Sequence, residues 1–318
     1  MKTQIIIEQI IVLGILIMTG AIGAWTRVIN ATVKESIARL VFNITLPLLI
    51  ITTFMNMEIS GKLLKNGLWV LIFSNIAIFI MWGMGNITLK WLKIKPKVKS
   101  IHLVHTMFGN IVFLGFPLID AMFPKTEALL YAALYYLVST YIMWTIGITI
   151  LQKDGSKKDL KHQMKNLFNP NTIAFFIGLI FMLFQVKVPE LAYNALKGIG
   201  KTTIYLSMLY IGSVLATTPI KGIFKRYDTF ILSLNKLIIV PIILILLIKW
   251  VTGMFNIAFD EIAQTIVIIE TAMPCMTLIV ILAKNYGADD VKAVEHVFVT
   301  TILSLFTLPF IYYLIGVI

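Results

Sequence analysis

The sequence FGNIVFLGFP occupies residues 108–117, in the middle of a hydrophobic run long enough to cross a membrane. Its glycines, asparagine and proline all disfavour a continuous helix, and Pro117 lacks the N–H group that a helix interior needs. Lipid offers no water to the freed carbonyl groups, so such a break persists only against protein or a water-filled cavity. A second break, TAMPC at residues 271–275, interrupts another hydrophobic run. Paired interruptions of this kind indicate a transporter's substrate site.

The composition is that of an integral membrane protein. Of the 318 residues, 59% are hydrophobic and 13% are charged, and the mean hydropathy is +0.92. Soluble domains carry roughly 25% charged residues. A net charge of +12 would suggest a nucleic-acid partner in a soluble chain. Here lysines in the loops between hydrophobic runs explain it, so we expect a lipid bilayer and no nucleic acid.

Hydrophobic runs of about 20 residues, the length that crosses the hydrocarbon core, recur along the chain. They predict an all-α polytopic membrane protein with ten transmembrane helices. The predicted spans are 5–25, 35–57, 66–89, 101–123, 127–151, 169–186, 197–218, 228–250, 261–284 and 290–316. Lys and Arg are concentrated after spans 1, 3, 5, 7 and 9, including Lys292, which places these loops in the cytoplasm. We therefore expect a multi-pass protein of the cell (plasma) inner membrane with both termini extracytoplasmic.

The positions of the two breaks, in spans 4 and 9, suggest two halves of five spans each. An odd number of spans per half forces opposite orientations, so we predict an inverted repeat. The first repeat is expected at 1–151, a cytoplasmic loop at 152–168 and the second repeat at 169–318. The broken helices 4 and 9 are then equivalent, and we expect them to cross.

The breaks predict a site for an anion. If the helices cross, each second half-helix starts near the membrane midplane, near Pro117 and Pro274, and proline is favoured at a first helical position. Free N–H groups and the positive dipole end attract negative charge there. Two ordinary proline kinks are the alternative. The expected substrate-binding residues in the breaks are Gly109, Asn110, Gly115, Pro117, Thr271, Pro274 and Cys275.

Polar residues elsewhere in the spans are further candidates. Asn43, Ser207 and Tyr210 can line the site, although small polar residues in membrane helices more often serve packing. Glu270 is an intramembrane carboxylate, hence a candidate for coupling to protons or sodium, and a purely structural role is equally open. Lys236 can balance a substrate charge, pair with Glu270 or extend to the membrane interface.

Two histidines at the start of span 4 and two residues early in span 10 are candidates for metal binding or proton handling. His102 and His105 share one helical face, a spacing that can bind metal. No third ligand is evident nearby, so we interpret them as a satisfied interfacial pair and predict no metal site. Glu295 and His296 can handle protons or lie at the interface.

The residues in and around the breaks resemble the auxin efflux carrier family, which includes plant auxin exporters and bacterial malate or malonate permeases. GNIVFLGFPL at 109–118 is similar to the span 4 signature of that family. Other similar stretches are RLVFNITLP at 39–47, NPNT at 169–172, AMP at 272–274, LAKNYG at 282–287 and TTILSLFTLP at 300–309. The resemblance covers the whole chain, and the lack of a long central loop is typical of a compact microbial permease.

This resemblance implies an inverted repeat with crossed helices 4 and 9, in a fold similar to that of bile acid/sodium symporters. It also implies a scaffold of helices 1, 2, 6 and 7, a transport domain of helices 3–5 and 8–10, and a homodimer. The predicted function is secondary transport of a small organic anion, a dicarboxylate such as malate or malonate, by alternating access.

The sequence leaves three other functions open. Efflux of an aromatic, auxin-like carboxylate is the alternative within the same class, and an anion channel or a membrane sensor is the alternative from another class. We expect no enzyme, because no Ser/His or paired-Asp constellation occurs at one depth. A nucleotide-driven pump lacks its GxxxxGK[ST] loop. No cofactor is expected, and protons or sodium ions are the candidate coupling ions.

Overall fold

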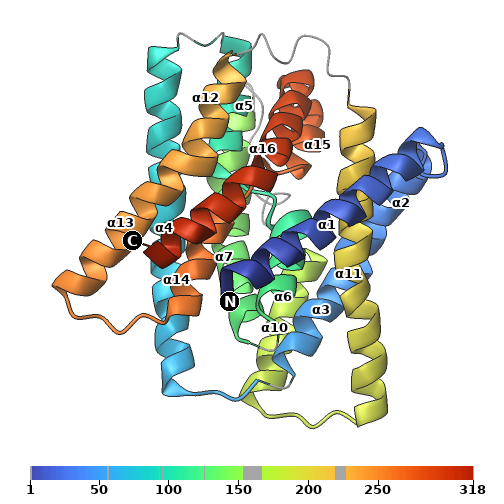
Figure 1. Cartoon of the computed structure of the whole chain (residues 1–318), viewed down its shortest axis with the longest axis vertical. Coiled ribbons are helices and arrows are strands. Elements are labelled where there is room, and N and C mark those ends of the chain that lie inside the picture. The colour runs from blue at the N-terminus through green and yellow to red at the C-terminus, as the bar shows by residue number, and fades with distance from the viewer. Residues whose placement is uncertain are drawn as a thin grey trace. The chain divides into compact units, whose positions relative to one another are not determined.

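The computed structural model describes residues 2–55, 57–92, 94, 96–124, 126–152, 167–218 and 227–317. The described residues form helices joined by short connections, with one isolated β-bridge and no named strand (Figure 1). The predicted cytoplasmic loop at 152–168 lies outside the described residues except at its ends, together with its lysines. The all-helical class is confirmed, and the orientation of the termini stays a prediction.

By internal contacts the chain divides into two compact units that interleave along the sequence. Unit 1 comprises Met1–Leu68, Val112–Leu134 and Lys165–Thr217. Unit 2 comprises Trp69–Ile111, Tyr135–Met164 and Thr218–Ile318. The predicted repeats at 1–151 and 169–318 divide the chain by sequence order, whereas the two units divide it by contacts. The repeats therefore stay a prediction. The assignment of scaffold and transport roles to the helices also stays a prediction.

Unit 1 is held together by close helix packing at small residues. Gly20 of α1 lies against the backbone of Leu209 in α11, and Gly212 of α11 lies against the backbone of Ile17, so neither position has room for a Cβ atom. Small residues of this kind let membrane helices approach closely. The elements of unit 1 are α1 (Lys2–Trp25), α2 (Ala31–Leu40), η1 (Val41–Thr45), α3 (Leu46–Phe54), α6 (Phe116–Met122), α10 (Pro170–Leu183), α11 (Glu190–Thr217) and the first parts of α4 (Gly61–Trp91) and α7 (Ala128–Ile142).

Unit 2 packs around a core of aliphatic, methionine and phenylalanine side chains. Ile78 and Met81 of α4 meet Ile101 and Val104 of α5, and Phe108 closes the same cluster. The elements of unit 2, besides the later parts of α4 and α7, are α5 (Pro96–Met107), η3 (Met143–Gly147), α8 (Ile148–Leu151), α12 (Tyr227–Leu234), η5 (Asn235–Ile239), α13 (Val240–Met254), α14 (Glu261–Thr271), α15 (Leu278–Asn285) and α16 (Asp290–Val317).

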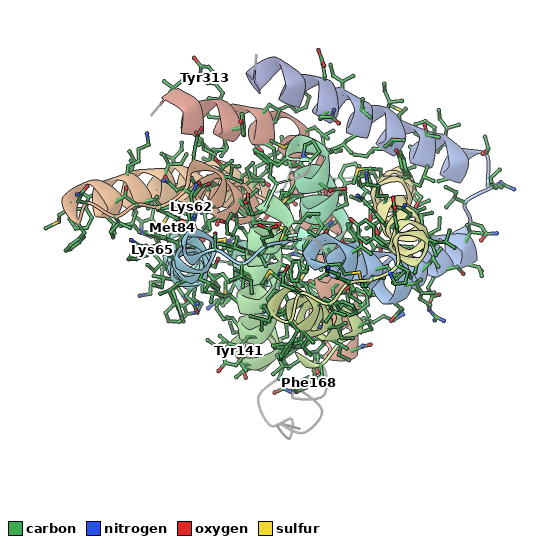
Figure 2. All side chains as sticks on the ribbon, turned by 90° about the horizontal axis from the view of Figure 1, so that it is seen from below. Lys62, Lys65, Met84, Tyr141, Phe168 and Tyr313 are labelled. Atoms are coloured by element: carbon green, nitrogen blue, oxygen red, sulfur yellow. The ribbon has the colours of Figure 1, made fainter. Side chains whose placement is uncertain are left out.

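The helices have the length and surface of membrane spans. Among the described residues, 6 helical stretches are long and apolar enough to cross a membrane: Ala31–Phe54, Gly61–Trp91, Ala128–Leu151, Glu190–Thr217, Tyr227–Met254 and Asp290–Val317. Ile11–Trp25, Ile111–Met122 and Pro170–Leu183 are shorter apolar helices. Large apolar side chains such as Tyr141, Phe168 and Tyr313 lie exposed (Figure 2), as a surface facing lipid requires. The protein is therefore polytopic, and the count of ten spans and the inverted repeat stay predictions.

In the described parts of the chain, four π-helical turns interrupt these spans, and three of them precede a proline. η1 ends before Pro47, η2 (Ile111–Gly115) before Pro117 and η5 before Pro241, each proline being the second residue of the α-helix that follows. A proline ring clashes with the carbonyl group of the preceding turn. A π-helical turn widens that segment and lets the helix continue through the proline.

Candidate functional site

The two predicted breaks are present, and within unit 2 they satisfy each other's backbone groups. α5 ends at Met107 and α14 ends at Thr271. The N–H of Asn110 donates to the carbonyl of Pro274 at 2.8 Å, and the N–H of Met276 donates to the carbonyl of Phe108 at 3.2 Å. Backbone groups that leave a helix at membrane depth must find partners in protein. Each break therefore supplies hydrogen bonds that the other needs.

Gly109 and Cys275 face each other at the centre of this paired segment, as an isolated antiparallel bridge. A Cβ atom on Gly109 would lie 2.9 Å from the Cβ of Met273, so the close approach requires glycine. The N–H of Cys275 donates to the hydroxyl of Thr300 at 3.0 Å, and its thiol donates to the carbonyl of His105 at 3.6 Å. Cys275 thus connects the break to both α16 and α5. We call residues 108–110 and 274–276 the paired breaks.

The expected starts of the second half-helices, near Pro117 and Pro274, are wrong. After the first break the helix resumes at Ile111, and Pro117 lies inside the continuous helix Ile111–Met122 because η2 accommodates it. After the second break α15 begins only at Leu278. Pro274 stays outside any helix, and its carbonyl is used to accept the hydrogen bond from Asn110.

Both predicted coupling residues are buried in unit 2, and they are not bonded to each other. The ammonium of Lys236, whose side chain is 0% exposed, donates to the carbonyl of Thr106 at 3.0 Å and contacts the sulfur of Met81 at 3.8 Å. In the described part of the chain it has no carboxylate partner, so it neither pairs with Glu270 nor extends to an interface. Both carboxylate oxygens of Glu270 are buried without a hydrogen-bond partner among the described residues.

The other predicted site residues divide between the units. In unit 2, Asn110 and Thr271 are buried, and the Thr271 hydroxyl lies 3.3 Å from the hydroxyl of Tyr135. In unit 1 lie Gly115, Pro117, Asn43, Ser207 and Tyr210. Asn43 is exposed and its amide donates to the carbonyl of Arg39, Ser207 is buried, and the ring of Tyr210 packs on Phe113 with centroids 4.7 Å apart.

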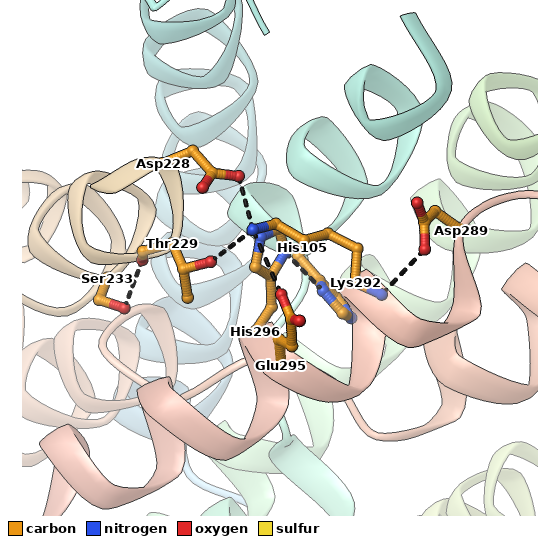
Figure 3. A network of polar contacts seen from close by, with 8 residues as sticks. All are labelled: His105, Asp228, Thr229, Ser233, Asp289, Lys292, Glu295 and His296. Atoms are coloured by element: carbon orange, nitrogen blue, oxygen red, sulfur yellow. Dashed lines mark hydrogen bonds and ion pairs between the residues drawn. The ribbon is translucent and has the colours of Figure 1, made fainter. Parts of the chain in front are cut away.

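The polar network around Lys292 in unit 2 is not predicted from the sequence, where Lys292 is expected to be a loop lysine. Lys292 is 2% exposed, and its ammonium lies 2.7 Å from Asp228, 3.4 Å from Glu295 and 2.9 Å from the hydroxyl of Thr229. Figure 3 shows it at the centre of these contacts. The available signal was the spacing of Lys292 and Glu295, which puts the two charges on one helical face.

The interpretation of His102 and His105 as an interfacial pair is also wrong. Both rings are buried, and they do not bond each other. Nε2 of His102 lies 3.0 Å from the hydroxyl of Thr88, whereas Nδ1 of His105 lies 3.2 Å from Nδ1 of His296. Within the described residues, no group of three or more His, Cys, Asp or Glu side chains is arranged to hold a metal ion.

The geometry of the helices and of the paired breaks by itself indicates a class of protein. Membrane-length helices, two mutually paired breaks and ionisable groups buried beside them are the features of a membrane transporter. Residues 5–312 match the profile of a family described as membrane transport protein. The chain belongs to this family, which confirms its resemblance to the auxin efflux carriers.

One relative carries the same general assignment. An uncharacterized transporter from Methanothermobacter thermautotrophicus is 23% identical over 308 residues, which is 95% of this chain and 96% of the relative. The similarity therefore spans both breaks and extends across nearly the whole length of each protein.

Proposed function

We propose that the protein is a secondary transporter of a small organic anion, a dicarboxylate such as malate or malonate, with the substrate bound at the paired breaks. The observation that carries this proposal is the isolated cation beside the breaks. Lys236 donates to the carbonyl of Thr106, in the last turn of α5, and in the described structure it has only neutral contacts. A buried charge without a counter-charge costs several kcal/mol, and an anionic ligand would remove that cost.

The paired breaks supply the remaining recognition groups. Asn110 places an amide side chain, a donor and acceptor for carboxylate oxygens, directly beside the hydrogen bond to Pro274. The hydroxyl of Thr271 lies on the turn that leads into the second break. Glu270 would repel an anion when ionised, so its role in this proposal is to carry a coupling ion and not to touch the substrate.

The transport cycle follows from the same geometry. We infer that helices 4 and 9 cross at the paired breaks, and that helices 3–5 and 8–10 move against helices 1, 2, 6 and 7. Hydrogen bonds between the breaks would move with the substrate site, because all four bonded residues lie in helices 4 and 9, which this proposal assigns to the same moving domain. Access would therefore alternate around a site whose backbone stays fixed.

The test is uptake of radiolabelled malate into proteoliposomes that contain the purified protein. We expect saturable uptake that accelerates when unlabelled malate is preloaded, as a carrier requires. Asn110→Ala is expected to weaken malate binding about tenfold, which corresponds to about 1.4 kcal/mol. Asn86→Ala is the matched control, because Asn86 is an asparagine on a helix and its amide donates to the carbonyl of Trp82, one turn earlier on the same helix.

Each outcome has a distinct meaning. Ion flux that does not saturate would contradict a carrier and indicate a channel. Saturable uptake of indole-3-acetate without uptake of malate would replace the dicarboxylate with an aromatic carboxylate. Equal uptake by wild type and Asn110→Ala would show that the substrate does not bind at the paired breaks.

A further inference from the structure

His105 and His296 form a hydrogen bond between identical atoms. The two Nδ1 atoms lie 3.2 Å apart, and both rings are 0% exposed. One Nδ1 must carry a proton and donate the hydrogen bond, and the other Nδ1 must be unprotonated and accept it. Both rings are then neutral, or the donor ring carries an extra proton on its Nε2. A second extra proton would make both Nδ1 atoms donors and break the bond. The pair can therefore bind one proton while its hydrogen bond persists.

Charged groups of opposite sign lie near this pair. Two carboxylates, Asp228 and Glu295, lie 2.7 Å and 3.4 Å from the ammonium of Lys292. Figure 3 shows this cluster next to the two histidine rings. Lys236 donates to the carbonyl of Thr106, the residue that follows His105. The titratable groups that face the pair are His102, Asp228, Lys236, Cys275, Lys292 and Glu295.

The pair is also connected to the paired breaks. The carbonyl of His105 accepts the thiol of Cys275, and the next carbonyl, that of Thr106, accepts the ammonium of Lys236. The carbonyl of His296 accepts the hydroxyl of Thr300 at 2.6 Å, and the same hydroxyl accepts the N–H of Cys275. Both histidines are thus one or two hydrogen bonds from the backbone that is proposed to hold the anion.

We propose that His105 and His296 form a proton-binding site whose occupancy is linked to anion binding through Lys236. Without an anion, burial and the charge of Lys236 both oppose an added positive charge, and the pair stays neutral. An anion that neutralises Lys236 removes that repulsion, and the nearby carboxylates of Asp228 and Glu295 then favour the proton. Coupling of this kind is reciprocal, so proton and anion would be transported together. This inference rests on the proposed function for the anion at Lys236 and for the transport step, whereas the proton site itself does not.

The proton site can be tested without any substrate, because removal of the Lys236 charge imitates the anion. The chain contains 4 histidines, so ¹⁵N-histidine labelling in lipid nanodiscs gives a spectrum simple enough to assign by substitution. We expect the ring nitrogens of His105 and His296 to stay neutral in wild type between about pH 5 and 8. In Lys236→Gln they are expected to take up one proton together within that range.

Three further variants make the test specific. Lys249→Gln is the matched control, because it removes an exposed lysine of α13. In this variant the His105–His296 pair is expected to stay neutral. Lys236→Met repeats the neutralisation with a side chain that needs no hydrogen bond. His296→Asn in the Lys236→Gln background places an amide near the position of Nδ1 and is expected to abolish the proton uptake. A pair that stays neutral in both Lys236→Gln and Lys236→Met would overturn the proposal.

Transport then tests the linkage. With malate as the probe, we expect an inward proton gradient to stimulate wild-type uptake and to leave His296→Asn uptake unchanged, while His162→Gln behaves as wild type. Gradient stimulation that survives in His296→Asn would overturn the coupling role. A wild type that carries no malate would refute the proposed substrate alone, because the labelled histidines still decide the proton site.

Discussion

Lys236 and Lys292 are both buried in unit 2, yet their surroundings are opposite. Lys292 has two carboxylates and a hydroxyl around its ammonium, whereas Lys236 has a carbonyl oxygen and a thioether in the described structure. A buried charge that is fully paired contributes to one fixed structure. A buried charge that is left with neutral partners remains available to a ligand. The difference separates a lysine that joins α12 and α16 from one that we propose binds the substrate.

The largest expected effect is at the paired lysine. Lys292→Met would leave Asp228 and Glu295 buried without a cation, and removal of one partner of a buried ion pair costs about 3–5 kcal/mol. We expect a corresponding loss of unfolding free energy, measured by denaturant titration in detergent micelles. Lys284→Met, at an exposed position, is the control. A loss below about 1 kcal/mol would show that the network does not depend on its cation.

Gly109→Ala tests the contact between the paired breaks, on which the proposed role of Lys236 depends. The added Cβ would lie 2.9 Å from the Cβ of Met273, and overpacking of this kind costs about 1–3 kcal/mol. We expect that loss in unfolding free energy and a faster reaction of the buried Cys275 with maleimide. Gly83→Ala, where no atom lies within 4 Å of an added Cβ, should leave both measurements unchanged. Equal labelling rates in the two variants would contradict the paired geometry.

The contrast between the lysines also shows which features a sequence reveals. The glycines, Asn110 and the prolines mark the breaks because each disturbs a helix locally, and the structure has both breaks. The π-helical turn before Pro117 is not visible in the same way, since it depends on how a helix absorbs a proline within a packed bundle. The helix start was therefore placed too late.

Contacts between distant helices were the hardest to predict. His105 and His296 are 191 positions apart, and periodicity shows only which residues share a face of one helix. For that reason the sequence predicts a pair formed by His102 and His105, which share a face of one helix, and does not predict the contact of His105 with His296. Lys292 was assigned to a loop because it stands at the beginning of a hydrophobic run, although α16 begins before it at Asp290.

Lys236→Met reverses the outcome expected for Lys292. Replacement of a buried, unpaired ammonium by an apolar side chain of similar length removes a desolvation cost, so stability should stay within about 1 kcal/mol of wild type or increase. Malate binding should nevertheless weaken about tenfold, or about 1.4 kcal/mol, in an equilibrium binding measurement. Lys249→Met controls for the loss of a lysine from the same helical stretch, Tyr227–Met254. A destabilised variant with unchanged malate affinity would make Lys236 a structural residue.

The smallest expected effect separates the contributions around Lys292. Thr229→Val keeps the shape of the side chain and removes the hydroxyl that lies 2.9 Å from the ammonium, while the contacts to Asp228 and Glu295 remain. One hydrogen bond to a charged group is worth about 1.5–3 kcal/mol when it is made alone, but the two carboxylates continue to satisfy this ammonium. We therefore expect a loss of about 1 kcal/mol in unfolding free energy, well below that of Lys292→Met. If Thr229→Val were as damaging as Lys292→Met, the ammonium would depend on its complete set of partners, and the distinction between the two lysines would lie in the number of hydrogen bonds and not in the charge.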